Sequence, residues 1–560
     1  MCGKEYSMKK FISIILALCV MATAFTACAQ QRSDEGEATY TGITLSDDGV
    51  LVGGTPASAD SSSDVYVSDD IVFYLEGQGE DYGEGEKDEE HSQTEADKHT
   101  VINITRPGNY MITGSISHGQ IAVNLGENAE NNPDAVVNIV LNNADITCTV
   151  APAIVCYNAY ECGPVKSEEA TKDVDTETAG FNITLADGSV NNISGSHVAK
   201  IYKPGTEKKL HKYDAAIESM VSFNINGDDG ILNLASDNEG IETKMHMTIN
   251  GGEININSQD DALNAGEDGV SVITINGGQI LANSNNGAEG DGIDSNGWIV
   301  INDGYLSAFA SEKAMESGLD SDLGTYINGG TVFAAGSMYD EISSESTQTF
   351  AVFSMDWWIY GEEYLVLKSS EGDATAAFKS PADYRVMVYS SPLLTEDDYT
   401  LYKAESVTGE SLHGIYANIT DITGEIQMAH SSSFGNSWPA MPQDGNMPQL
   451  PQGGDDRLPQ APPENMPRDS DFTKFPDDIG NAELPEDFKG KMPKGEKGER
   501  PQRMGGMTPP DVPDGENAQE FDKDRKNHFA MSFGTGNLNP VFSIVKGGNM
   551  FSRITEYTQE

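Results

Sequence analysis

Positive charge is scarce in this sequence of 560 residues. It contains 34 Lys+Arg against 89 Asp+Glu, a formal net charge of -55, and no Arg lies between positions 107 and 384. Such an excess of carboxylates would repel nucleic-acid phosphates, so we expect no nucleic-acid partner. Long amphipathic helical patterns are also lacking. The composition instead suits a protein outside the cell, or one that binds metal cations.

Cysteine is also scarce, and its arrangement excludes two kinds of site. Apart from those in the N-terminal segment, the chain has Cys148, Cys156 and Cys162. An odd number excludes a full disulfide framework, which leaves one bridge plus a free thiol, or three apolar thiols. The absence of a CxxC motif argues against a zinc site.

The N-terminus has the pattern of a targeting segment. From Met8 it reads MKKFISIILALCV, a basic start followed by an apolar run that is too short to span a membrane well. The run ends in Phe-Thr-Ala-Cys28, similar to a bacterial lipobox. We therefore predict a lipoprotein signal peptide over 1–28, with Cys28 lipidated and the protein anchored to the outer face of a bacterial membrane. The alternative is an ordinary cleaved signal with a chance cysteine.

An internal repeat dominates the middle of the chain. Ile-Asn pairs recur at Ile225, Ile249, Ile275, Ile301 and Ile327, with spacings of 24, 26, 26 and 26 residues. Each lies in an alternating phrase such as ITINGGQILAN, whose Asn-Gly turn is typical of strand-turn-strand structure. No leucine ladder and no 3.6-residue periodicity is present, so the period predicts an all-β fold of the β-solenoid type. The isoleucines should form an inward ladder, and the asparagines an amide ladder.

Composition divides the chain into further segments. We predict a solenoid over 29–344 with acidic insertions at 77–98 and 161–179 that form mobile surface loops. Longer alternating phrases predict a small antiparallel β cap over 345–430. Residues 431–530 are rich in Pro and Met and predict a disordered low-complexity linker. Residues 531–560 regain alternation and should return as a strand to the cap.

Acidic phrases recur once in each repeat. They align on a branched residue at Ile217, Ile241, Leu263, Ile293 and Leu319, which stacks the flanking acids in columns. Carboxylates about 5 Å apart repel each other by roughly 1 to 3 kcal/mol, so a bound cation should offset the cost. Calcium takes 6 to 8 oxygens at about 2.3–2.6 Å, which suits this spacing. The alternative is that these are solvated turn acids. The predicted ligands of several Ca²⁺ ions are Asp214, Glu218, Asn238, Glu239, Glu242, Asp260, Asp261, Asn264, Asp291, Asp294, Glu316 and Asp320.

Several phrases resemble a known bacterial family. They are GNYMITGSISHGQIAVN, VNIVLNNADITC, FNITLADGSVN, DGIDSNGWIVINDGYL and VYSSPLLTEDDYTLYKA, in that order. They resemble the carbohydrate-binding domain-containing proteins, which are secreted. The resemblance implies a right-handed parallel β-helix, related in fold to pectate lyases and loaded with calcium. It also implies binding of cellulose-like or polygalacturonate-like chains without established lyase activity.

Three functions follow from these observations. The first is a cell-surface, calcium-dependent, non-catalytic protein that binds a plant cell-wall or other acidic polysaccharide. Its sugar-stacking candidates are Trp298, Trp357 and Trp358, although each also suits core or cap packing. The second is a pectate-type lyase with Lys244 as the base, a role that also suits a surface lysine and that the missing arginines weaken. The third is a surface adhesin with a protein partner.

Overall fold

The protein is all-β in a computed structural model that describes residues 39–77, 83–84, 89–202, 209–285, 287–435 and 538–557. Within these ranges, the helical elements are α2 (Gln93–Ala96), the 3₁₀ turn η2 (Ala129–Asn131) and a single 3₁₀ residue at position 89. The predicted signal peptide, Cys28 and residues 436–530 lie outside the described ranges. In the described part of the chain, no helix combines the length and apolar character needed to cross a membrane.

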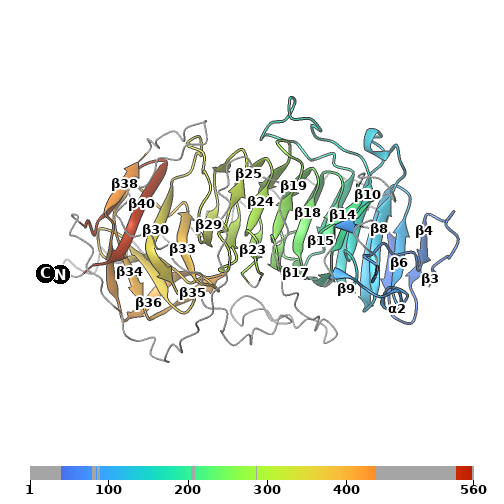
Figure 1. The fold of residues 1–560 in the computed structure, drawn as a ribbon, viewed down its shortest axis with the longest axis horizontal. Coiled ribbons are helices and arrows are strands. Elements are labelled where there is room, and N and C mark those ends of the chain that lie inside the picture. Colours follow the sequence, from blue (N-terminus) through green and yellow to red (C-terminus); the bar gives the residue numbers. More distant parts are fainter. Residues whose placement is uncertain are drawn as a thin grey trace, which may run out of the picture. The chain divides into compact units, whose positions relative to one another are not determined.

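Most strands pair in parallel with a strand from the preceding or following repeat, and these pairings form three columns (Figure 1). The first column contains β1 (Thr41–Leu45), β7 (Gly108–Ile116), β9 (Val137–Thr147), β11 (Phe181–Leu185), β16 (Phe223–Asn226), β19 (His246–Ile249), β22 (Val272–Ile275), β25 (Trp298–Ile301) and β28 (Thr325–Ile327). The second continues from the end of β9 through β12 (Val190–Gly195), β17 (Ile231–Ser236), β20 (Glu253–Asn257), β23 (Gln279–Asn283), β26 (Tyr305–Phe309) and β29 (Thr331–Gly336).

The third column is a separate nine-stranded sheet. It contains β6 (Thr100–Ile104), β8 (Gly119–Asn124), β10 (Ile154–Asn158), β15 (Ala215–Ser219), β18 (Glu239–Thr243), β21 (Leu263–Ala265), β24 (Ile293–Ser295) and β27 (Asp320–Ser321), with β4 (Val65–Ser68) antiparallel to β6. From β15 to β29 the chain adds one strand to the third, first and second columns in turn. Each repeat therefore stacks on the one before it.

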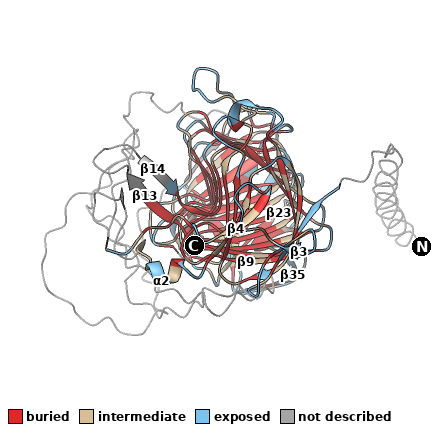
Figure 2. Ribbon diagram, turned by 90° about the vertical axis from the view of Figure 1, so that its right-hand side faces the viewer, coloured by how far each residue is buried: buried red, intermediate tan, exposed pale blue. Residues whose placement is uncertain are grey.

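Two ladders predicted from the repeat are present. The side chains of Ile225, Ile249, Ile275, Ile301 and Ile327 are all 0% exposed and belong to one apolar core. Asn250, Asn276, Asn302 and Asn328 each donate from the side-chain amide to the Asn one repeat earlier, at 2.9 to 3.0 Å. Figure 2 shows the buried residues concentrated within the stacked strands. Burial of the apolar ladder drives the stacking, and the amide ladder satisfies the polar groups beside the turns.

Antiparallel strands follow the last repeat. They are β30 (Phe350–Ile359), β31 (Tyr364–Lys368), β32 (Ala374–Phe378), β33 (Tyr384–Ser390), β34 (Asp397–Ala404), β35 (Ser406–Leu412), β36 (Ile415–Thr423), β37 (Ile426–Ala429) and β38 (Ser432–Gly435). β33 pairs antiparallel with β29, so it covers the edge that the last repeat would otherwise expose. The late strands β39 (Phe542–Ile544) and β40 (Gly548–Glu556) join the same region through β34 and β30.

Short strands complete the described structure. β2 (Leu51–Val52) and β3 (Thr55–Pro56) form a hairpin beside β1. β5 (Gly83–Glu84), β13 (Val198–Tyr202) and β14 (Lys209–Tyr213) form a three-stranded sheet of their own. β14 leads directly into β15, so the last residues of β14 lie at the edge of the third column.

The insertion 161–179, predicted to be a surface loop, makes hydrogen bonds with the repeats. Glu161 accepts hydrogen bonds at 2.7 and 2.6 Å from the backbone N–H and the hydroxyl of Ser222. The Thr176 hydroxyl lies 2.7 Å from both the side-chain amide oxygen of Asn224 and the Thr248 hydroxyl. These outward side chains come from neighbouring strands of the first column. The insertion therefore satisfies polar groups that the repeats leave on their outer face.

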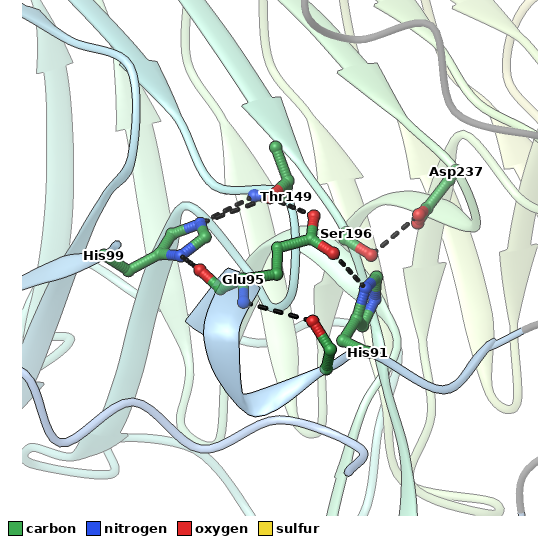
Figure 3. A network of polar contacts seen from close by, with 7 residues as sticks. His91, Glu95, His99, Thr149, Ser196 and Asp237 are labelled. Carbon is green, nitrogen blue, oxygen red and sulfur yellow. Dashed lines mark hydrogen bonds and ion pairs between the residues drawn. The ribbon is translucent and has the colours of Figure 1, made fainter. Parts of the chain in front are cut away.

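The described end of the acidic insertion 77–98, residues 89–98, also makes polar contacts with the rest of the fold (Figure 3). Glu95, in α2, accepts a hydrogen bond at 2.9 Å from the Thr149 hydroxyl, and His91 Nδ1 lies 3.7 Å from its other oxygen. The backbone N–H of Thr149 donates to His99 Nε2 at 3.1 Å. Burial lowers the pKa of His99 to about 4, so the ring is neutral and can accept this bond.

The buried His197 links this insertion to the repeats, because it contacts both Glu89 and Asp237, which follows β17. His197 Nδ1 lies 3.1 Å from Asp237, which also accepts from the Ser196 hydroxyl at 2.7 Å, and His197 Nε2 lies 3.3 Å from Glu89. Burial alone would lower the pKa of His197. The two carboxylates outweigh it and raise the pKa well above its usual value. The resulting ion pairs fix residue 89 against the stacked strands.

Candidate cation site on the third column

The acids align as one column because the branched residues beside them are buried in register. Ile217, Ile241, Leu263 and Ile293 pair along β15, β18, β21 and β24, and all four are 0% exposed. The following residues therefore point away from the core and stack on one another. In order, this column contains Glu218, Glu242, Asn264, Asp294 and Asp320.

Three carboxylates meet at the first of two clusters. Asp214, Glu239 and Glu242 each offer an oxygen, and the three oxygens lie within 4.8 Å of one another. Asn264 donates from its amide to Glu239 Oε1 at 3.0 Å, and Lys212, on β14, forms an ion pair with Asp214. The Oε2 atoms of Glu239 and Glu242 are buried without a hydrogen-bond partner. The cluster thus has both counter-charges and unused acceptors.

Burial and mutual repulsion shift the titration of the first cluster. Burial raises the pKa of Glu218 and Glu239 well above the usual range, and the neighbouring Glu242 carboxylate raises both further. Burial likewise raises the pKa of Glu242, although the Lys212 ammonium opposes this. Burial alone would lower the pKa of Lys212, but the carboxylates of Asp214, Glu242 and Glu239 raise it. The column therefore favours protons or another cation over bare charge.

The second cluster contains Asp261, Asp291 and Asp294, all buried, with one oxygen of each within 4.8 Å of the others. Asp261 Oδ1 accepts from the backbone N–H of Asp291 at 2.6 Å, and Asp291 Oδ1 accepts from that of Ser317 at 2.6 Å. Asp291 Oδ2 is buried and has no hydrogen-bond partner. Burial, and then Asp261, Asp320, Glu316 and Asp294, raise the pKa of Asp291 well above its usual value.

Glycine allows the backbones of neighbouring repeats to approach each other closely at the second cluster. Gly290 has φ +130°, and a Cβ at this position would lie 2.6 to 2.8 Å from the backbone of Asp260. A side chain is therefore excluded both by conformation and by space. This explains why the acidic phrase around Asp291 is interleaved with glycine: the backbone of one repeat must approach the next closely enough to bring their carboxylates together.

The donor set fits a hard divalent cation. Calcium prefers carboxylate and carbonyl oxygens, and both clusters supply several carboxylates at the spacing that bridges one ion. The buried oxygens that lack a partner are independent support, because each would otherwise carry an uncompensated desolvation cost of about 1–3 kcal/mol. Neither cluster contains a thiolate or imidazole, the ligands that favour zinc.

The other predicted ligands lie at different positions along the same edge. Asn238, Asp260 and Glu316 lie in the turns before their strands and are half-buried, whereas Asp320 begins β27 at the end of the column. Asn238 uses its backbone carbonyl to accept from the N–H groups of Gln259 and Asp260 at 3.0 and 3.1 Å. Six of the twelve predicted residues thus form the two clusters.

The predicted sugar-binding tryptophans are separated in the fold. Trp298 lies on β25 and is half-buried. Trp357 and Trp358 lie near the end of β30, where Trp357 is 63% exposed and Trp358 half-buried. Trp357 is therefore open to a ligand, whereas the other two are partly covered by the protein.

The candidate base does not face either acidic cluster as a free amine. Lys244 Nζ lies 3.7 Å from Glu267 Oε2, and its side chain is 50% exposed. The geometry is that of a surface ion pair.

The three cysteines form no disulfide bridge with one another. Cys148, Cys156 and Cys162 are all free thiols.

Sequence reasoning missed two residues beside the column. Lys212 lies on β14, outside the repeat, so periodicity gave no signal for it. Asp340 lies beyond the last acidic phrase and accepts from the backbone N–H of Ser321 at 3.2 Å. Burial, and then the charge of Asp320, raise the pKa of Asp340 to about 6.

Comparison with known proteins supports the family suggested by the sequence phrases. A family model described as "Carbohydrate-binding domain-containing protein" matches residues 98–356, which include both clusters. A protein of the same description from Acetivibrio thermocellus is 30% identical over 155 residues, or 28% of this chain. The match spans 44% of that relative's length. A solved structure of the polysaccharide lyase-like protein from C. thermocellum, a gadolinium derivative, matches 52% of this chain and 90% of its own. Its TM-score is 0.30, at 19% identity.

Proposed function

We propose that this chain is a calcium-dependent, non-catalytic polysaccharide-binding protein of the cell surface. The single observation that carries the proposal is the pair of buried carboxylate clusters, with unpartnered oxygens, inside the region matched by the carbohydrate-binding family model. The family match supports a polysaccharide as the partner. The clusters support a cation as part of the folded protein.

The architecture that we infer is a right-handed parallel β-helix. The regular return of the chain to the same three columns, and the in-register pairing of successive repeats, support it. In such a fold one turn of chain brings equivalent residues about 4.8 Å apart. That spacing is what allows a single ion to contact carboxylates from successive repeats.

Each cluster would hold its cation through a defined set of side chains. Asp214, Glu239 and Glu242 would hold one ion, and Asp261, Asp291 and Asp294 another. A bound Ca²⁺ supplies two positive charges that offset repulsion within the column. The chain's own contribution is to bury the carboxylates and to fix Asp291 Oδ1 through the N–H of Ser317. The ions would then hold neighbouring repeats in the geometry that a sugar-binding surface requires.

A non-catalytic role agrees with the position of Lys244. A lyase base must reach the proton it removes, whereas Lys244 is paired with Glu267 on the surface. Incubation with polygalacturonate should therefore give no rise in ultraviolet absorbance from unsaturated products. A rise that is lost in Lys244→Ala would establish the lyase alternative instead.

Metal analysis and a pull-down test the main proposal. Protein purified in calcium should retain the ion after gel filtration, and chelation should lower its melting temperature. It should sediment with insoluble polysaccharide in calcium and less well in EDTA. Absence of bound alkaline-earth metal together with an EDTA-insensitive melting curve would contradict the calcium claim. Absence of sedimentation with every polysaccharide, alongside capture of a defined surface protein, would favour the adhesin alternative.

The location follows from the N-terminal prediction. A lipid on Cys28 would hold the mature protein at the outer face of a bacterial membrane, with the lipid as its membrane contact. Metabolic labelling with a fatty-acid analogue tests this, and Cys28→Ala should abolish the label. Label retained in that variant would place the modification elsewhere.

A further inference from the structure

A cavity lies beyond the last strand of the acidic column. It has a volume of about 320 Å³. Its walls come from the β27–β28 turn and from residues 340–343, which run beside β28 through the pairing of Thr325 with Ile342. The lining residues are Ser321, Asp322, Leu323, Gly324, Tyr326, Asp340, Glu341 and Ser343. The size is that of the smaller ligand sites in proteins.

The apolar part of the cavity is built from Tyr326 and Leu323. Leu323 is 46% exposed, and Tyr326 is half-buried on β28. Lys172, from the insertion 161–179, places its ammonium group 5.0 Å from the centre of the Tyr326 ring. Trp298 lies close by, because Ile299 pairs with Thr325 and so sets Trp298 beside Gly324. An aromatic wall with adjacent hydrogen-bonding groups is the arrangement that receives the C–H face of a sugar ring.

The polar part of the cavity accepts hydrogen bonds and discriminates by charge. Asp322, Asp340 and Glu341 bring three carboxylates, and the backbone N–H of Ser321 fixes Asp340 at 3.2 Å. Carboxylates are strong acceptors for hydroxyl donors. They repel a ligand that is itself a carboxylate, by about 1 kcal/mol per pair at 4 Å in water and more where water is excluded. The Lys172 ammonium nearby is paired with Asp173 at 2.7 Å and does not line the cavity, so the lining carboxylates favour a neutral polyol over a uronic acid.

We propose that this cavity is a subsite for one neutral sugar residue of a polysaccharide chain. Tyr326 stacks on the sugar with the ring face that Lys172 does not cover, while Asp322, Asp340 and Glu341 accept from the sugar hydroxyls. The inference rests on the proposed polysaccharide-binding function. It adds the location of one sugar subsite and the expectation that the sugar bound there is uncharged. It differs from the expectation of an acidic polysaccharide. Lys172 lies over the Tyr326 ring and so brings the insertion 161–179 beside the cavity.

The experiment compares substitutions in the cavity with a matched control. Tyr326→Ala removes the stacking ring, Tyr326→Phe keeps it, and Tyr360→Ala removes a 42% exposed tyrosine from the cap. Glu341→Gln removes an exposed carboxylate and should leave the fold intact. Binding to a soluble neutral glucan or xylan, and to oligogalacturonate, is measured by calorimetry in calcium and in EDTA. Melting temperatures confirm that each variant is folded.

We expect the wild type to bind the neutral chain more tightly than oligogalacturonate in EDTA. Tyr326→Ala should weaken neutral binding by about ten-fold, whereas Tyr326→Phe and Tyr360→Ala should leave it unchanged. Glu341→Gln should weaken binding of the neutral chain. It should also reduce the ratio between the affinities for the neutral chain and for oligogalacturonate. This pattern would support the subsite.

Four other results would overturn the inference in distinguishable ways. Wild-type binding that is unaffected by Tyr326→Ala and Glu341→Gln would remove the cavity and leave the polysaccharide function standing. Loss of binding in Trp357→Ala alone would move the site to the cap. Tighter binding of oligogalacturonate in EDTA would contradict the expectation of an uncharged sugar. Absence of binding to any polysaccharide would remove the proposed function together with the subsite.

Discussion

Replacing Asp291 with Asn separates the cost of buried charge from the benefit of a bound cation. Asp291 Oδ1 accepts from the N–H of Ser317, and an Asn can keep that bond. The buried Oδ2, which has no partner, becomes an amide donor that faces the carboxylates of Asp261 and Asp294. The substitution therefore removes one negative charge and adds a compatible hydrogen-bond donor while leaving the packing volume almost unchanged.

The two effects have opposite signs. Charges within 4.8 Å repel by roughly 1 kcal/mol at a dielectric of 80 and about 3 kcal/mol at 20, so Asp291→Asn should stabilise the calcium-free protein by up to that amount. Calcium at a hundred-fold excess over its dissociation constant stabilises the wild type by about 2.7 kcal/mol per site. The variant should lose that gain at the second cluster. Calcium should therefore raise the stability of the wild type more than that of the variant, and the wild type should be the more stable of the two in calcium where the relieved repulsion is below about 2.7 kcal/mol.

The assay is thermal unfolding with and without calcium. In a unit of this size about 1 kcal/mol corresponds to roughly 1 °C in the midpoint. The calcium-induced rise should be about 3 °C smaller in Asp291→Asn than in the wild type. Glu289→Gln is the matched control, because Glu289 is an exposed acid in the same phrase. The reasoning is refuted if Asp291→Asn and Glu289→Gln show the same calcium response as the wild type.

Three further predictions concern the column, the amide ladder and the packing between the last two repeats. The pKa of Asp340 is raised to about 6, so the folded state binds its proton more tightly than the unfolded state. In EDTA this group should therefore add stability as the pH falls from 7.5 to 5.5, a gain that a melting series should find smaller in Asp340→Asn. Buried histidines whose pKa is lowered, such as His99, act in the opposite direction, which is why the paired comparison is needed. Asn276→Ala breaks two ladder bonds and should cost about 1 kcal/mol in chemical denaturation, with Asn276→Gln as the test of geometry. Phe333→Ala removes a ring packed 5.1 Å from Phe309, and should cost about 3–5 kcal/mol, whereas Phe333→Leu should cost clearly less. Equal unfolding curves for the two Phe333 variants would contradict the packing argument.

The repeats and the column could be predicted because each depends on a periodic physical requirement. The buried ladder of Ile225 and its equivalents requires one apolar residue at the same place in every repeat, so their spacing appears directly in the sequence. The residue after each branched position must then point outward and stack. The spacing of the branched residues is therefore enough to predict that Glu242, Asn264 and Asp294 stack in one column.

Residues outside the period could not be predicted in the same way. Lys212 reaches Asp214 from a strand that belongs to another sheet, and nothing in the repeat encodes that approach. The insertion 161–179 has the acidic composition of a solvated loop. Its hydroxyl and carboxylate groups nevertheless match polar side chains that point outward from the first column, such as Asn224. Composition reports the average affinity of a segment for water, whereas its position depends on individual pairings.

The column is divided in two by one neutral residue. Between Glu242 and Asp294 the register places Asn264, whose amide donates to Glu239 at 3.0 Å. A carboxylate there would extend an unbroken row of charges at strand spacing, each repelling its neighbours. The first cluster also has the Lys212 ammonium, which acts against the rise in pKa of Glu242. In contrast, the groups that shift the pKa of Asp291 are burial and four other carboxylates, all in the same direction. The first cluster is therefore partly neutralised by the chain itself, and the proposal of a bound cation applies more strongly to the second.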